Sequence, residues 1–242
     1  KFNKTLKPIF SLKFNPSKNK NISGLDRRIN YDNIFSFNRI AENKTLEGGT
    51  SITLGNEYKI FSKENLNEEI FGFNLATSLR NKKNNDLPNK SSLNEKQSNV
   101  VGKINYKLTN FLDLNYDFVT DESISDFKYH NVDMEFKINN FVSSFQYLEE
   151  NDNIGKESFI SNETKLELND NSNLSFRTRR NKKLNLTEYY DLIYQYKMDC
   201  LTAGIKYNKS YYTDGSLKPN ESIIFSVTIM PFKNTINLPS IN

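Results

Sequence analysis

The chain has 242 residues and a mass of 28.2 kDa, and 36% of its residues are hydrophobic, 26% are charged and its mean hydropathy is −0.70. A globular domain normally carries about 45–50% apolar residues, which argues against one ordinary soluble core. Disorder is not favoured either, because 13 Tyr and 18 Phe accompany a net charge of only +4. No stretch approaches 18 consecutive apolar residues, so a transmembrane helix is excluded. Membrane strands with one apolar face remain possible.

Composition also restricts the chemistry. The single Cys rules out a disulfide within the chain, and one Cys with one His is too few for a zinc site. The sequence has no Gly-rich phosphate loop, nucleophile elbow or HExxH motif. His130 lacks a context that would make it a catalytic base. We therefore expect no enzyme, no catalytic or metal-binding residue, and no cofactor.

Apolar and polar residues alternate with a period of two along most of the chain, which predicts β-strands. About twelve strands of roughly 7–11 residues are expected, near the length that crosses a bilayer when tilted. In chain order they cover residues 10–14, 50–60, 71–79, 100–108, 112–118, 132–138, 141–148, 160–168, 174–178, 190–198, 201–211 and 222–232.

The polar faces of these strands are strongly charged. Eight side chains are expected to point to the same side of the sheet: Asp113, Asp117, Asp133, Glu135, Lys137, Glu163, Lys165 and Glu167. Such a face suits a hydrated lumen and would be costly against lipid. Tyrosines at strand ends could form interfacial girdles, namely Tyr58, Tyr147, Tyr189, Tyr211 and Tyr212.

The connections alternate in length. Short turns are expected at 109–110, 139–140, 170–173 and 199–200, and longer polar loops at 80–99, 121–126, 149–157, 180–185 and 213–220. Asn is frequent in the chain, with 37 residues, and it supports the positive φ of tight hairpins. Short turns on one side and long loops on the other predict an all-β, transmembrane antiparallel β-barrel of outer-membrane type. A soluble β-sandwich or solenoid is the structural alternative.

Two stretches carry a family resemblance. The first is the segment 31–40 (YDNIFSFNRI) followed by 46–58 (LEGGTSITLGNEY), and the second runs from Tyr190 to Phe232 around the core 196–207 (YKMDCLTAGIKY), with Asp214, 217–219 and the closing apolar strand. Both resemble the LptD family, also called OstA, the lipopolysaccharide-assembly proteins of Gram-negative outer membranes. The resemblance covers nearly the whole chain, with the matching segments in the same order.

The resemblance implies a partial chain in the cell outer membrane. Residues 1–232 would be the C-terminal part of a larger barrel, contributing about 12 of its strands, and residues 233–242 a short polar tail. Its function would be to insert lipopolysaccharide into the outer leaflet. The implied partners are an LptE-type plug lipoprotein, periplasmic bridge proteins reached through an N-terminal domain, lipopolysaccharide and membrane lipid, with no nucleic acid. The functional alternative is a self-contained, porin-like channel of about 12 strands.

The resemblance also suggests roles for individual residues. The last strand would form one edge of a lateral gate: Ser222, Ile223, Ile224, Phe225, Ser226, Val227, Thr228, Ile229 and Met230. Cys200, at a short periplasmic turn, would be oxidised to a Cys of the N-terminal domain, although a free thiol is the simpler interpretation.

Two further groups are candidates for contacts with partners. Asp32, Arg39 and Glu47 lie in an outer loop expected to fold over or into the lumen, where they could hold the plug or only pack the loop. A basic group near another outer loop could meet lipopolysaccharide phosphates or be only a solvated loop: Arg177, Arg179, Arg180, Lys182 and Lys183.

Overall fold

The computed structural model describes residues 2–42, 45–63, 68–108, 110–151, 154–211 and 219–229. These residues form twelve β-strands and one short 3-10 helix, η1 (Asn89–Ser91). The strands are β1 (Phe2–Asn15), β2 (Gly49–Ser62), β3 (Glu69–Arg80), β4 (Val100–Leu108), β5 (Leu112–Thr120), β6 (Phe127–Ile138), β7 (Phe141–Glu150), β8 (Ser158–Asn169), β9 (Ser172–Asn181), β10 (Leu186–Lys197), β11 (Leu201–Ser210) and β12 (Asn220–Ile229). Among the described residues, no helix is long and apolar enough to span a membrane.

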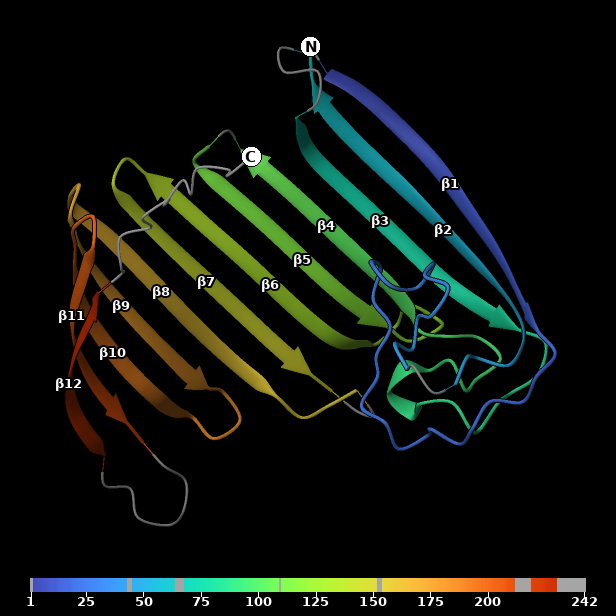
Figure 1. Ribbon diagram of the computed structural model, residues 1–242. Coiled ribbons are helices and arrows are strands. Elements are labelled where there is room, and N and C mark those ends of the chain that lie inside the picture. The colour runs from blue at the N-terminus through green and yellow to red at the C-terminus, as the bar shows by residue number, and fades with distance from the viewer. Residues whose placement is uncertain are drawn as a thin grey trace, which may run out of the picture.

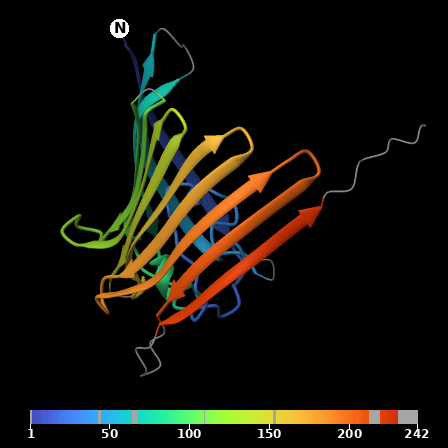
Figure 2. The same cartoon turned by 90° about the vertical axis from the view of Figure 1, so that its left-hand side faces the viewer.

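The strands form one antiparallel sheet in which every strand pairs with its neighbours in sequence, from β1 through to β12. The sheet curves strongly. Strands β11 and β12 lie at its left edge in Figure 1 and nearest the viewer in Figure 2. It is not closed, because β1 and β12 are its two edges. The predicted all-β antiparallel fold with about twelve strands is therefore confirmed. Several strands are longer than expected, because polar residues at their ends continue the pairing, as in β1 and β6.

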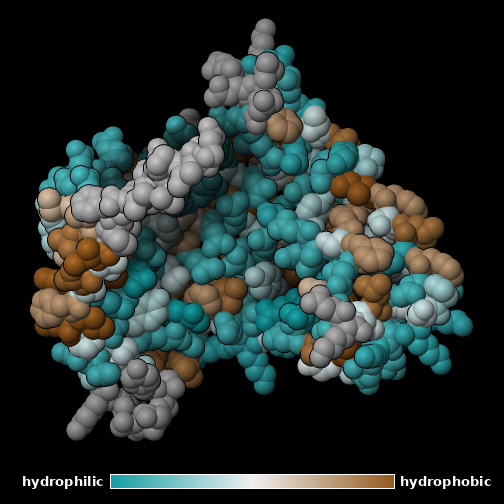
Figure 3. Space-filling model, viewed as in Figure 1, coloured by the Kyte–Doolittle hydropathy of each residue, from teal (hydrophilic) through white to brown (hydrophobic). Residues whose placement is uncertain are grey.

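The two faces of the sheet differ as the alternation predicts. Register places the eight charged side chains between positions 113 and 167 on the concave face, where for example Asp113 lies opposite Glu135 and Ser144 opposite Glu163. Figure 3 looks onto this face and shows mostly hydrophilic side chains across its centre. The convex face carries the large exposed apolar side chains, including Phe10, Leu54, Phe145, Leu192 and Phe225. This arrangement fits a barrel wall with water inside and lipid outside.

One of the predicted girdle tyrosines lies on the concave face. Tyr189 pairs with Arg179 and has the same parity as Asp191. It lines hollows on the concave face together with Arg177, so it cannot belong to a lipid-side girdle and that prediction was wrong for this residue. Tyr212 lies outside the described residues.

The connections have the predicted asymmetry. Residues 16–48, 81–99, 121–126, 151–157 and 182–185 connect strands at one end of the sheet, which is the lower end in Figure 1, whereas 139–140, 170–171 and 198–200 are tight turns at the other end. We call these the long-loop end and the short-turn end. In outer-membrane barrels the longer loops are extracellular. The expected loop at 213–220 and the tail at 233–242 fall largely or wholly outside the described residues.

The hydrophobic core lies at the long-loop end, between the concave face and three loops. Apolar side chains from the loops pack there against the small or branched residues Ala76, Val101 and Val119 of the sheet. The loop contributors are Ile29, Tyr31, Ile34, Ile40, Leu87, Leu93 and Ile154. The sheet itself has little other core among the described residues, because its convex face is exposed.

Candidate functional site

The candidate site is a cap over the concave face, made of residues 16–42, 45–48 and 81–99. Figures 1 and 2 show these loops inside the curve of the sheet, across the first strands. The two loops bind each other through backbone hydrogen bonds, from Ile22 N to Asp86 O (2.8 Å) and from Asn89 N to Ser23 O (3.2 Å). The cap is therefore one folded unit attached to the sheet.

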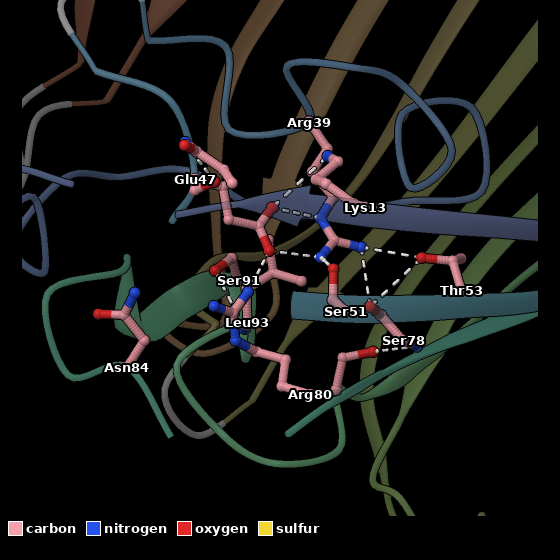
Figure 4. A network of polar contacts seen from close by, with 12 residues as sticks. Lys13, Arg39, Glu47, Ser51, Thr53, Ser78, Arg80, Asn84, Ser91 and Leu93 are labelled. Carbon is pink, nitrogen blue, oxygen red and sulfur yellow. Dashed lines mark hydrogen bonds and ion pairs between the residues drawn. The ribbon is translucent and has the colours of Figure 1, made fainter. Parts of the chain in front are cut away.

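A buried ion pair anchors the cap. Arg39 donates from Nε and Nη2 to the two carboxylate oxygens of Glu47, at 2.6 and 2.5 Å. Its remaining donors reach three hydroxyls of the concave face: Ser51 (3.0 Å), Thr53 (3.0 Å) and Ser78 (2.8 Å). Figure 4 shows this fan of contacts beneath the cap. The Arg39 side chain is fully buried and that of Glu47 is 3% exposed, so the pair is almost completely removed from water.

Two strand residues add positive charge around the same carboxylate. Arg80, at the end of β3, pairs with Glu47 and also donates to the carbonyl oxygen of Gly48. Lys13 of β1 lies 3.6 Å from Glu47 and donates to the Ser36 and Phe37 carbonyls. Glu47 thus joins loop 16–48 to both β1 and β3.

This environment keeps Glu47 ionised. Burial opposes the charge on the carboxylate, but the hydrogen bonds and charge of Arg39, together with Lys13 and Arg80, outweigh burial and lower the pKa of Glu47 below its ordinary value. A buried charge pair with these hydrogen bonds adds specific geometry to a loop whose apolar side chains also pack in the core.

The glycines beside Glu47 are needed for close approach. A Cβ on Gly48 would lie 2.4 Å from the backbone oxygen of Ser17, and Gly49 has a φ of +91°, which L side chains rarely adopt. On the sheet, a Cβ on Gly55 would lie 2.5 Å from the ring of Phe35. The Glu-Gly-Gly motif is therefore explained by one ionic contact and two tight backbone positions.

Two further ion pairs attach the cap to the sheet. Asp32 accepts from Lys103 of β4 at 2.8 Å, and Arg28 pairs with Glu150 at the end of β7. The Asp32 side chain is 61% exposed. Of the three predicted lumen-loop residues, Arg39 and Glu47 are thus occupied in packing the loop on its own sheet, whereas Asp32 is still open to solvent.

Beyond the cap, the concave face has a polar hollow of about 410 Å³ over β5 to β10. Its charged lining residues are Asp113, Asp133, Glu135, Glu163 and Arg177. Carboxylates predominate, as expected for a hydrated interior surface rather than a lipid-binding one. Among the described residues, no group of His, Cys, Asp or Glu is arranged to hold a metal ion.

The predicted basic group does not form one cluster. Arg177 and Arg179 lie on the concave face, where Arg177 pairs with Asp191 at 2.9 Å and Arg179 with Glu188 at 2.8 Å. Lys183 donates to the backbone oxygens of the 151–157 connection and its flank, at 2.8 and 3.1 Å.

The other two members of the basic group are on the convex face. Register places Arg180 beside Ile160 there, and Lys182 contacts Tyr147. The basic residues between positions 177 and 183 therefore lie on both faces of the sheet, because neighbouring strand residues point in opposite directions.

At the C-terminal edge, β12 pairs with β11 alone among the described residues. Ile223, Phe225, Val227 and Ile229 are exposed on its convex face. Met230 of the expected gate strand lies outside the described residues. Cys200 is a free, half-buried thiol in the turn between β10 and β11 at the short-turn end.

Sequence reasoning missed the contributions of Lys13 and Arg80 to the anchor. Both looked like ordinary polar positions of strands. The available signal was their parity: each falls on the polar face of its strand and near the strand end that precedes a long loop. The sequence did not reveal that both side chains meet the same carboxylate.

Comparison with protein families identifies the architecture. The sequence model described as LPS transport system D (LptD) matches residues 1–169, well over half of the chain. The chain belongs to the LptD family. The match spans the cap and β1 to β8 of this LptD-family chain, whereas the segment 190–232 lies outside it. No curated protein matches the chain.

Proposed function

We propose that this LptD-family chain forms the C-terminal part of a larger barrel in the Gram-negative outer membrane and inserts lipopolysaccharide into the outer leaflet. The family points to lipopolysaccharide transport and outer-membrane assembly. The observation that carries the proposal is the open sheet with lipid-compatible side chains outside and a polar, capped surface inside. A polar interior suits the sugar portion of the cargo, and the apolar exterior suits its acyl chains.

The proposal involves no covalent chemistry. LptD is a transport and assembly family, and a conduit needs only a polar path and a lipid-facing exit. A self-contained channel of twelve strands would require β1 to pair with β12. These strands are the two edges of the described sheet, which favours a part of a larger barrel.

The partners we propose are an LptE-type plug lipoprotein inside the barrel and periplasmic bridge proteins that deliver lipopolysaccharide. The open concave surface over β5 to β10 supports the first, because the cap covers only the beginning of the sheet. We propose that the edge strand β12 forms one side of the exit for lipid.

The test is replacement of the corresponding protein in a Gram-negative host by the full-length protein that contains this chain. Outer-leaflet lipopolysaccharide, measured with an externally added antibody, is expected to return to normal. A photoreactive residue at concave Asp133 should capture the plug lipoprotein or lipopolysaccharide, whereas one at the adjacent convex Val132 should not capture the plug. Correct assembly of the barrel without surface lipopolysaccharide would contradict the proposal.

The Cys200 disulfide is a separate prediction. The thiol lies at the short-turn end, which is periplasmic in this orientation, and the periplasm is oxidising. Cys200→Ser in the full-length protein should change its mobility in non-reducing electrophoresis and leave its mobility under reducing conditions unaltered. Equal mobility of both forms without reductant would remove the disulfide from the proposal.

A further inference from the structure

A contiguous patch lies on the convex face near the long-loop end, where β7, β8 and β9 run side by side. It consists of Tyr147, Glu149, Ile160, Arg180 and Lys182, which we call the outer-wall patch. Register pairs Ile160 with Tyr147 on one side and with Arg180 on the other. Lys182 donates to the Tyr147 hydroxyl at 3.1 Å, and its ammonium lies 4.6 Å from the centre of that ring.

Only one of the two cations of this patch has a carboxylate partner within it. Arg180 is exposed and donates to the amide oxygen of Asn185, and no carboxylate among the described residues lies within ion-pair distance of it. Lys182 is 40% exposed, and its nearest carboxylate is Glu149 at 3.9 Å, which also accepts from Tyr147. Two cations thus face outward with one carboxylate.

Apolar side chains lie level with these charges and toward the short-turn end from them. On the same convex face, Ile160 is 44% exposed and lies opposite Arg180, whereas Phe145 and Phe176, 39% and 38% exposed, lie toward the short-turn end, where the small polar residues Asn162 and Thr178 share the face. The patch therefore passes from apolar to cationic over a few residues. That order matches a lipid whose acyl chains end at a phosphate-bearing headgroup, because guanidinium and ammonium groups bind phosphate oxygens through charge-assisted hydrogen bonds.

We propose that the outer-wall patch binds a phosphate of lipopolysaccharide that already resides in the outer leaflet, with the acyl chains along Phe145, Ile160 and Phe176. Charge complementarity and the apolar-to-cationic order select an anionic lipid, and the long-loop end places it in the outer leaflet. The site rests on the outer-membrane placement of the family, not on transport itself. It differs from the concave Arg177 and Arg179, whose charges are paired with Asp191 and Glu188.

Binding is tested with the purified full-length protein, stripped of lipid and placed in nanodiscs of phosphatidylcholine with a small fraction of lipopolysaccharide. Native mass spectrometry then counts retained lipopolysaccharide. The double variant Arg180→Gln/Lys182→Gln should bind about tenfold more weakly, as expected for the loss of charge-assisted contacts. Glu149→Gln should bind more tightly than the unmodified protein, because it removes the carboxylate beside Lys182.

The matched control is Lys137→Gln/Lys165→Gln, which removes the same charge from exposed positions on the concave face, and it should bind normally. Dephosphorylated lipopolysaccharide should bind the unmodified protein as weakly as native lipopolysaccharide binds the double variant. Two outcomes would overturn the site: equal loss in the control, or equal retention of dephosphorylated lipid. Phosphatidylglycerol that competes as well as lipopolysaccharide would overturn the choice of lipid.

This experiment stays informative if the double variant fails to assemble, because the dephosphorylated lipid and Glu149→Gln comparisons use an intact patch of cations. It also separates this site from the proposed function. Equilibrium binding to purified protein requires no translocation, so a failed complementation with normal binding would leave the outer-wall patch standing.

Discussion

Glu47→Gln is expected to release the cap from the concave face. The substitution keeps the size of the side chain but removes the charge that faces Arg39, Arg80 and Lys13. Breaking a buried pair by neutralising one partner costs about 3–5 kcal/mol, because the remaining charge stays buried and uncompensated. We expect the local stability of the cap to fall by an amount of this order.

The first measurement is cleavage of loop 16–48 in the full-length protein by a protease added to the outside of intact cells. The second is the sensitivity of those cells to a large antibiotic that the outer membrane normally excludes. Both should rise in Glu47→Gln. The control is Glu95→Gln, which removes a carboxylate of the other cap loop from an exposed pair with Lys83. Exposed pairs contribute about 0–1 kcal/mol, so this variant should behave normally. Unchanged cleavage in Glu47→Gln would show that the anchor is not what holds the cap.

The same anchor sets a direction for pH dependence. The pKa of Glu47 is lower in the folded cap than the ordinary 4.5 of a glutamic acid. Its ionic contribution is therefore complete above about that pH and is lost as the pH falls through the lowered value. Cleavage of the loop should increase only in strongly acidic medium, and Glu47→Gln should remove this acid-dependent step.

The fold was largely predictable because the solvent outside and inside a barrel differ. Lipid and water on opposite faces impose a strict alternation, so the pattern Ile223, Phe225, Val227, Ile229 locates β12 without any structure. The alternation of short and long connections then predicts that successive strands pair as antiparallel neighbours and that the long loops gather at one end of the sheet. Thr187 shows where this reasoning stops, because a bulge between Thr187 and Tyr189 inserts one residue and places Thr187 opposite Arg180 on the convex face.

The cap was only partly predictable. The motif around Glu47 indicated a special loop, but a loop of this length has no periodicity from which its path can be derived. Its shape depends on contacts between residues far apart in sequence, such as Arg39 with Ser78 and Arg28 with Glu150. Strand parity shows which side chains are available on the concave face and not which of them the loop will contact.

Phe145→Lys should prevent assembly of the barrel and Gln146→Lys should not, although the two positions are adjacent in β7. Phe145 is exposed on the convex face, whereas Gln146 points to the concave face and lines the polar hollow. A lysine on the lipid side costs about 2–4 kcal/mol at the bilayer midplane and less toward the interfaces, and Phe145 lies on the acyl-chain side of the outer-wall patch. At position 146 the new ammonium would meet water and the carboxylates of Asp133 and Glu163 across the hollow, so it should be tolerated.

The assay is the amount of heat-modifiable, protease-resistant full-length protein in the outer-membrane fraction. Gln146→Lys should assemble like the unmodified protein, and Phe145→Lys should be strongly depleted, because the strand must place a charge against acyl chains before the barrel can close. Phe145→Leu serves as the volume control, since it shortens the side chain without adding charge and should assemble. Equal assembly of both lysine variants would mean that the convex face is not lipid-exposed at β7, and the assignment of inside and outside for this wall would have to be reversed or abandoned.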